Sequence, residues 1–169
     1  MAEDAERPRK RRSLGGWKFI VAIILILGYS AGAAYGVLSD TSVRGLTVKM
    51  FNVSRYCTAQ SSSPRTLNYN VRGAIWSASS IPTSLSHISF TLSVDGSVMG
   101  TATQSDTSFG PGQSVSFNLT FTDPTLNPTM LPLSSKLVLS LSATVAAGLY
   151  SSTEATSDST IHTFASNGC

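Results

Sequence analysis

The chain opens with a cluster of basic residues followed almost at once by a long, uncharged apolar run. The basic residues are Arg7, Arg9, Lys10, Arg11 and Arg12, and the apolar run extends from Phe19 to Leu38. As a helix rising about 1.5 Å per residue, this run matches a hydrocarbon core of about 30 Å. The sequence therefore predicts one transmembrane helix over 19–38. Because Lys and Arg beside a span stay in the cytoplasm, we expect residues 1–18 inside the cell membrane and the C-terminal domain outside.

Two other fates of this segment remain open. A cleaved secretory signal would use Ala31, Gly32 and Ala33 as a small-residue cleavage site. An archaeal pilin-type signal would need a charge just before a cleaved glycine, which the stretch from Leu14 to Lys18 fits badly. Retention as a signal anchor is favoured because the apolar run continues past the cleavage site to Leu38.

The predicted span carries a face of small residues. Gly28, Gly32 and Gly36 are spaced four apart, so one helix face bears all three. Glycine at this spacing lets a second transmembrane helix approach closely, although glycine is also common in membrane helices generally. The basic cluster from Arg7 to Arg12 is also suited to contact with anionic lipid headgroups. The expected partners are therefore the lipid bilayer and another transmembrane helix, a membrane complex or a second copy.

Composition changes after the span. Residues 1–18 hold six Lys or Arg against three Asp or Glu, so the net charge of +3 lies in the tail, and the two signs balance six to six from Ser39 onward. No basic patch remains to hold phosphates, so no nucleic-acid partner is expected. Of the 131 residues from Ser39 to Cys169, 45 are Ser or Thr. A mucin-like stalk would share this composition but would lack a periodic apolar pattern.

Such a pattern is present, with a period of two. Apolar residues alternate with polar ones at 67–71, 88–94, 115–121 and 137–145, which indicates strands with one buried face. Asp95-Gly96 suits a two-residue type I′ hairpin, and Gly110-Pro111-Gly112 marks another turn. We predict an all-β fold: a single antiparallel β-sandwich of about seven strands, immunoglobulin- or fibronectin-like, over 45–169, preceded by a linker at 39–44.

Several of these segments resemble one known domain family. The order Leu67-x-Tyr69-x-Val71, Ile81-Pro82, Ile88 to Gly96, Gly100 and Phe109 to Phe117 looks like the WHy domain, the water-stress and hypersensitive-response domain of group 2 late-embryogenesis-abundant proteins. The family's Asn-Pro step is replaced here by Ser77 to Pro82. The resemblance implies a seven-stranded sandwich, and a tail, span and outer domain is also the layout of plant membrane proteins with this domain. It implies no catalytic residues.

The outer segment also offers candidate modification sites. Cys57 and Cys169 are the two cysteines, and outside the cell they are expected to form an intramolecular disulfide, with crosslinking between subunits and free thiols as alternatives. Asn52 and Asn118 begin glycan acceptor sequons. Asn118 is expected on the exposed face of its strand. Asn52 has an ambiguous register, since the apolar parity changes between Met50 and Phe51, as at a β-bulge.

No set of residues points to catalysis. The two histidines, His87 and His162, are expected at surface or edge positions. The six acids are scattered, and no nucleophile elbow, phosphate loop or zinc motif occurs. We therefore expect no enzyme, no cofactor, no metal and no small-molecule substrate.

The predicted function is a membrane-anchored, non-catalytic interaction module or accessory subunit of an envelope complex. The alternative is a structural subunit of a surface layer, pilus or thread after signal cleavage. The charge-poor surface favours an archaeal envelope.

Overall fold

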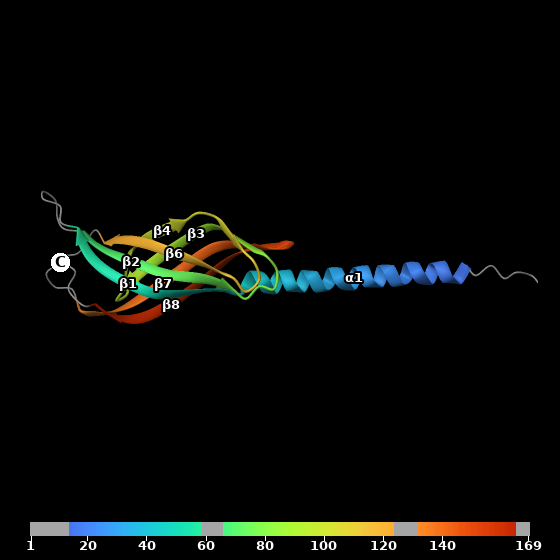
Figure 1. The fold of residues 1–169 in the computed structure, drawn as a ribbon, viewed down its shortest axis with the longest axis horizontal. Helices are drawn as coiled ribbons and strands as arrows, with labels where there is room; N and C mark the ends of the chain where they lie inside the picture. The colour runs from blue at the N-terminus through green and yellow to red at the C-terminus, as the bar shows by residue number, and fades with distance from the viewer. Residues whose placement is uncertain (1–13, 59–65, 124–131, 165–169) are drawn as a thin grey trace, which may run out of the picture. The chain divides into compact units, whose positions relative to one another are not determined.

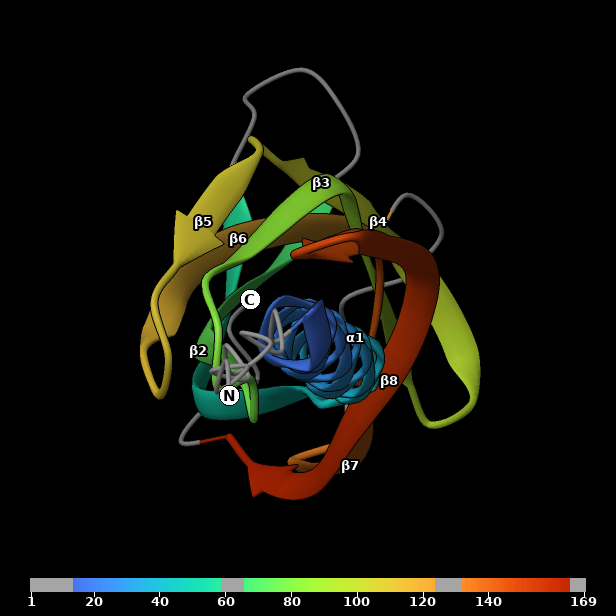
Figure 2. The ribbon, with the colours of Figure 1, turned by 90° about the vertical axis from the view of Figure 1, so that its right-hand side faces the viewer.

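A computed structural model describes residues 14–58, 66–123 and 132–164. It contains one helix, α1 (Leu14–Arg44), and eight strands. The strands are β1 (Leu46–Thr58), β2 (Thr66–Ser77), β3 (Thr83–Val94), β4 (Ser97–Gln104), β5 (Thr107–Phe109), β6 (Ser114–Asp123), β7 (Ser134–Ala147) and β8 (Tyr150–Thr163). Figure 1 labels all of them except β5, which Figure 2 labels. The chain divides into two units, one ending at Tyr35 and one, the domain, beginning at Gly36.

The strands form two antiparallel sheets. The first has the order β1-β2-β6, and the second has the order β4-β3-β7-β8, with β5 also paired to β3. The strand β8 lies beside β1 and β4 beside β6, so the two sheets meet along both edges (Figure 2). In constant-type immunoglobulin domains the fourth strand lies with the first two, whereas here β4 pairs with β3 in the other sheet. The predicted all-β sandwich behind one N-terminal helix is confirmed.

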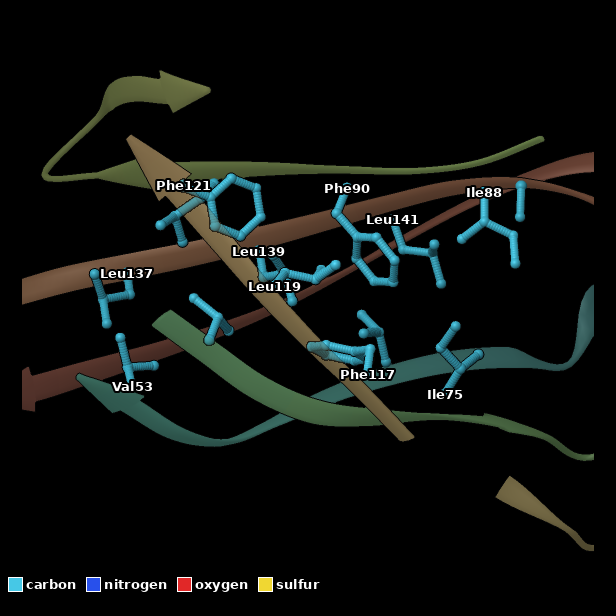
Figure 3. Close-up of a cluster of buried hydrophobic side chains, with 14 of the residues drawn as sticks. Val53, Ile75, Ile88, Phe90, Phe117, Leu119, Phe121, Leu137, Leu139 and Leu141 are labelled. Carbon is cyan, nitrogen blue, oxygen red and sulfur yellow. The ribbon is translucent and has the colours of Figure 1, made fainter. Parts of the chain in front are cut away.

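The core lies between the two sheets and follows the predicted alternation. Val53, Ile75, Phe117, Leu119 and Phe121 point inward from the first sheet, and Ile88, Phe90, Leu137, Leu139 and Leu141 from the second (Figure 3). The rings of Phe90 and Phe117 meet across the core with centroids 4.8 Å apart. Burying these side chains stabilises the fold by roughly 1.5–3 kcal/mol each relative to exposure.

Both predicted irregularities of the strands are present. The β3–β4 hairpin turns at Asp95 and Gly96, whose φ angles of 51° and 87° are those of a type I′ turn. The register of β1 against β2 shifts between Met50 and Asn52, which confirms the bulge. A third irregularity was not predicted. His87 has a φ of 52° where the β3–β7 register shifts between Ser86 and Ser89, and β3 pairs with β5 before this point and with β4 after it.

Two elements differ from the sequence prediction. The helix continues through the residues expected as a linker, 39–44, because Ser39, Ser42 and Val43 are buried within the domain. The last strand, β8, covers Tyr150–Thr163 and lies outside the segments whose alternation predicted strands. Its start lacks alternating apolar residues because the side chains that face the core side there are polar, such as Ser152 and Thr156.

Candidate interaction surfaces

The first candidate surface is the apolar part of α1. The helix is long and apolar enough, from Gly16 to Arg44, to cross a membrane, and its most apolar window is wholly uncovered. Large side chains such as Ile24, Leu25 and Leu27 are exposed all along it. A soluble domain would bury such a helix against its core. The structure therefore has an N-terminal apolar helix of membrane-spanning length, which suits either an anchor or a signal sequence.

The three glycines of α1 have different surroundings. A Cβ placed on Gly28 or Gly32 would meet nothing within 4 Å. A Cβ placed on Gly36 would lie 3.8 Å from the hydroxyl oxygen of Tyr150, at the start of β8. Helix packing through Gly28 and Gly32 stays a prediction, whereas Gly36 already has a neighbour within the domain. The basic residues from Arg7 to Arg12 lie outside the described residues.

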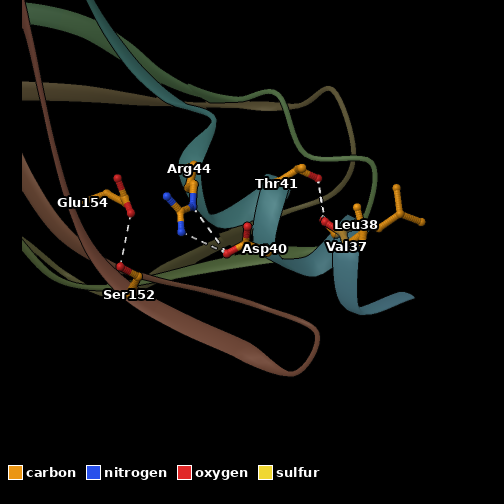
Figure 4. A network of polar contacts seen from close by, with 7 residues as sticks. All are labelled: Val37, Leu38, Asp40, Thr41, Arg44, Ser152 and Glu154. Atoms are coloured by element: carbon orange, nitrogen blue, oxygen red, sulfur yellow. Dashed lines mark hydrogen bonds and ion pairs between the residues drawn. The ribbon is translucent and has the colours of Figure 1, made fainter. Parts of the chain in front are cut away.

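The last turns of α1 combine exposed polar contacts within the helix with burial against the domain. The Thr41 hydroxyl donates to the carbonyl oxygens of Val37 and Leu38 at 3.0 and 3.1 Å. The Nε of Arg44 lies 3.4 Å from an Asp40 carboxylate oxygen (Figure 4). Since this ion pair is solvent-exposed, it adds about 1 kcal/mol at most. The helix is therefore held in the domain chiefly by the burial of its last turn.

The second candidate surface is the outer face of the β1-β2-β6 sheet. Register places Asn52, Arg72 and Asn118 side by side in one row across the three strands. All three side chains are exposed, so both sequons are accessible on the same face. The Asn70 amide donates to the Asn118 side-chain oxygen at 2.9 Å. The sequence predicted the exposure of Asn118 but not this row, because strand order is a tertiary feature.

An exposed aromatic residue stands beside this row. Phe51 occupies the bulge of β1 and is 65% exposed. Its ring and that of Trp76 form a T-shaped pair, with centroids 5.4 Å apart and planes at 84°. Sequence reasoning did not single out Phe51 as a contact residue, although the parity change at Met50 and Phe51 was the available signal. We call Phe51, Asn52, Arg72, Trp76 and Asn118 the Asn-Arg face.

The outer face of the second sheet has a different chemistry. Hydroxyl side chains follow one another across the four strands, for example Thr101, Thr91, Ser140 and Ser157 in one row. The exposed apolar side chain of Val98 lies at the β4 edge, next to the β3–β4 hairpin. Its exposed apolar side chains, Val98 on β4 and Ile161 on β8, are aliphatic and stand on opposite edge strands, and the rows between them offer hydrogen bonds. The Asn-Arg face is therefore the better contact surface of the two.

A buried polar cluster closes the end of the domain opposite Gly36. Arg55 points inward from β1, donates to the Pro132 carbonyl at 2.9 Å and lies 4.1 Å from the ring centre of Phe164. Burial raises the pKa of the Tyr69 hydroxyl, and the charge of Arg55 together with a hydrogen bond to it opposes this rise. Cys57 lies two residues beyond Arg55, near the end of β1. Cys169 lies outside the described residues, so its pairing with Cys57 stays a prediction.

The acids and histidines do not converge. Asp95, Asp106 and Asp158 each accept a bond from a backbone N–H, at Lys136, His87 and Met50 respectively. His162 packs on Phe164 with ring centroids 4.7 Å apart. Among the described residues no group of three or more His, Cys, Asp or Glu could hold a metal ion. A shallow hollow of about 240 Å³ is lined by Pro82, Thr83, Ser84, Ser108, Ala146 and Gly148, none of which titrates.

Comparisons with known proteins give structural likeness alone. No family model and no curated protein matches the chain. The fold is similar to that of a protein from Archaeoglobus fulgidus, with a TM-score of 0.38 and 12% identity over 68% of this chain and 97% of that one. It is also similar to a Bordetella pertussis protein described as ApaA, with a TM-score of 0.40 and 12% identity over 73% of this chain and 98% of that one. Neither likeness bears on function.

Proposed function

We propose that this protein is a single-pass membrane protein that presents a non-catalytic β-sandwich on the outer side of the membrane, as an interaction module or accessory subunit of an envelope complex. The uncovered apolar helix carries the proposal. In water its apolar side chains would be exposed to solvent along its length, whereas a bilayer would cover them. The basic residues before the helix support a cytoplasmic N-terminus. The water-stress domain resemblance and an archaeal envelope stay predictions.

We assign the contact with the partner to the Asn-Arg face. Interfaces are commonly centred on an exposed aromatic residue or Arg surrounded by groups that hydrogen-bond, and Phe51 and Arg72 provide this arrangement. The described charges on the outer face of this sheet are Lys49 and Arg72, both positive. The partner surface is therefore neutral or acidic, with a hollow for the Phe51 ring.

Copurification tests this function. Full-length protein, extracted from native membranes in mild detergent, is expected to bring down a defined partner. Phe51→Ser is expected to reduce the recovered partner at least about tenfold, the effect of losing one interface anchor. Val98→Ser is the matched control, since Val98 is also 65% exposed but lies on the other sheet. Recovery of only a dispersed monomer, or equal loss with both variants, would contradict the proposal.

Glycans on Asn52 and Asn118 would compete with this contact. Both acceptor amides lie in the row of the Asn-Arg face, so attached sugars would cover Arg72. Peptide mass spectrometry of protein from its native membranes measures the occupancy of each site. Full occupancy of both would move the protein contact to another face, whereas unmodified Asn52 and Asn118 leave the Asn-Arg face available.

The alternative is a structural subunit released by signal cleavage. It predicts a mature N-terminus near Ala33 and filaments on the cell surface. The anchored module predicts an uncleaved chain that stays in the membrane pellet at alkaline pH. Intact-mass measurement of the extracted protein distinguishes the two, because cleavage would remove the whole basic tail and most of the apolar run.

We also propose that Cys57 pairs with Cys169. The bridge would join the end of β1 to the C-terminus and close a loop of 111 residues. On the chain-entropy model such a loop stabilises the fold by about 4–5 kcal/mol. Peptide mapping without reductant is expected to recover the two cysteines in one crosslinked species of monomer mass. A crosslinked dimer would favour pairing between subunits.

A further inference from the structure

The hairpin between β7 and β8 has an apolar tip whose leucine, Leu149, projects away from the domain. Its two-residue turn consists of Gly148 and Leu149, and Gly148 has a φ of 59°, as the first position of a type II′ turn requires. Leu149 is 80% exposed, and Tyr150 is 48% exposed. Turn tips in water are usually polar, as the Asp95-Gly96 turn of this same domain is. The apolar tip therefore requires another explanation.

The position of the tip relative to α1 indicates what covers it. The Tyr150 hydroxyl oxygen lies 3.8 Å from the Cβ position of Gly36, and Gly36 belongs to the predicted span, which ends at Leu38. Figure 4 draws Ser152 and Glu154 of β8 in the same view as Asp40 and Arg44 of α1, with the polar contacts made within each pair. The start of β8 therefore lies at Gly36, the first residue of the domain and a member of the apolar run.

The chain around the tip carries no charge. No Asp, Glu, Lys or Arg occurs from Leu137 to Thr153, so entry of this hairpin into a bilayer would desolvate no ionised group. Tyr is a residue that membrane–water interfaces favour, because its ring is apolar and its hydroxyl stays hydrated. An exposed Leu followed by a half-exposed Tyr suits the outer leaflet.

We propose that the tip of the β7–β8 hairpin, Leu149 with Tyr150, inserts into the outer leaflet of the bilayer beside the point where α1 leaves it. This inference rests on the proposed membrane anchoring. The hairpin is then a second attachment of the domain, which limits its rotation about the helix and presents the Asn-Arg face in one orientation. Lipid acyl chains surround the tip in this arrangement. The test must distinguish this from a partner protein that covers the tip.

Depth-dependent fluorescence quenching tests the insertion. Full-length protein carrying Trp17→Phe and Trp76→Phe has no other tryptophan, so Leu149→Trp introduces a single reporter. The protein is reconstituted in phosphatidylcholine vesicles with acyl chains brominated near the headgroup or near the methyl end. The L149W reporter is expected to lose most of its emission with the headgroup-proximal bromines, to lose less with the deep ones, and to resist aqueous acrylamide.

The control is Val98→Trp in the same background, placed at the β3–β4 hairpin end of the domain. Its emission is expected to be unaffected by brominated lipid and quenched by acrylamide. Equal behaviour of the two reporters would overturn the insertion, as would an L149W reporter shielded from both quenchers, because protein would then cover the tip.

Alkaline extraction of the same samples tests the anchor separately. Release into the supernatant overturns the anchoring itself, whereas a pelleted chain with an unquenched L149W reporter overturns the hairpin insertion alone.

Discussion

The two ends of the sandwich turn the chain with hairpins of equal length but opposite chemistry. At the end that holds Arg55 and Cys57, Asp95 leads the β3–β4 turn and is tied to β7, because its carboxylate accepts from the Lys136 N–H at 2.8 Å and its own N–H donates to the Lys136 carbonyl at 2.9 Å. At the end that holds Gly36, Leu149 projects from the β7–β8 turn and is 80% exposed. Polar groups at the first end hydrogen-bond within the domain, whereas the apolar tip at the second end is available for contact with another surface.

The largest effect is expected at the first end, from Arg55→Leu. The substitution leaves the Pro132 carbonyl and the Tyr69 hydroxyl without their charged donor, and it removes the cation that lies over Phe164. We expect a loss of about 3 kcal/mol of unfolding free energy. Denaturant unfolding of the full chain in detergent, followed by near-ultraviolet circular dichroism, measures it. A change below about 1 kcal/mol would show that this end is not held by Arg55.

A smaller loss is expected from Asp95→Ala. The alanine cannot accept from the Lys136 N–H, and a non-glycine residue without a polar side chain is strained at a φ of 51°. We expect a loss of about 2 kcal/mol, from about 1 kcal/mol for each effect. Asp95→Asn is the matched control, because asparagine tolerates this φ and keeps a side-chain acceptor. If Asp95→Ala and Asp95→Asn have the same free energy of unfolding, the hydrogen bond to Lys136 does not contribute to stability.

Tyr69 gives this end a pH dependence. Its pKa in the folded state is raised from 10.0, first by burial, so the contribution of the neutral phenol is fully present below pH 10 and is lost as pH rises through the folded pKa. Tyr69→Phe loses about 1 kcal/mol at neutral pH with the hydrogen bond. The difference from the parent is expected to shrink in alkaline solution, as unfolding curves at pH 8 and above pH 10 would show. A constant difference would mean that the phenol does not ionise on unfolding.

The two ends also differ in how well sequence patterns predict their strands and turns. The strands β3, β6 and β7 were predictable because their inward residues, such as Phe90, Phe117 and Leu139, are apolar and alternate with polar ones. The Asp95-Gly96 turn was predictable because few residue pairs adopt positive φ twice in succession. The first half of β8 was not predictable. It lies at a sheet edge, where inward residues such as Ser152 and Glu154 stay polar, and an inward charge such as that of Glu154 protects an edge strand from pairing with another chain.

The contact surfaces were less predictable than the strands, because they depend on which strands become neighbours. Asn52 and Asn118 were identified as sequons, but their row with Arg72 exists only because β2 pairs with both β1 and β6. The helical state of residues 39–44 likewise depends on a tertiary contact. Val43 is 2% exposed within the domain, and this burial extends the helix through Asp40 and Thr41, which favour a turn or linker in isolation.

The smallest effect is expected at the second end, from Gly36→Ala. The added Cβ would stand at an ordinary contact distance of 3.8 Å from the Tyr150 hydroxyl oxygen, and alanine favours a helix over glycine by up to about 1 kcal/mol. The domain should therefore unfold at the same denaturant concentration as the parent or slightly above it. The same change at Gly73 is the control, because its Cβ would clash with the Lys49 carbonyl oxygen and with Cζ of Phe117. That variant should be clearly destabilised.

A Gly36→Ala variant that unfolds as early as Gly73→Ala would mean that the second end is packed as tightly as the middle of the β1-β2-β6 sheet. The hairpin would then have no room to meet the lipid. A Gly36→Ala variant of normal stability that loses an oligomeric state would instead support the predicted helix-packing face of Gly28, Gly32 and Gly36.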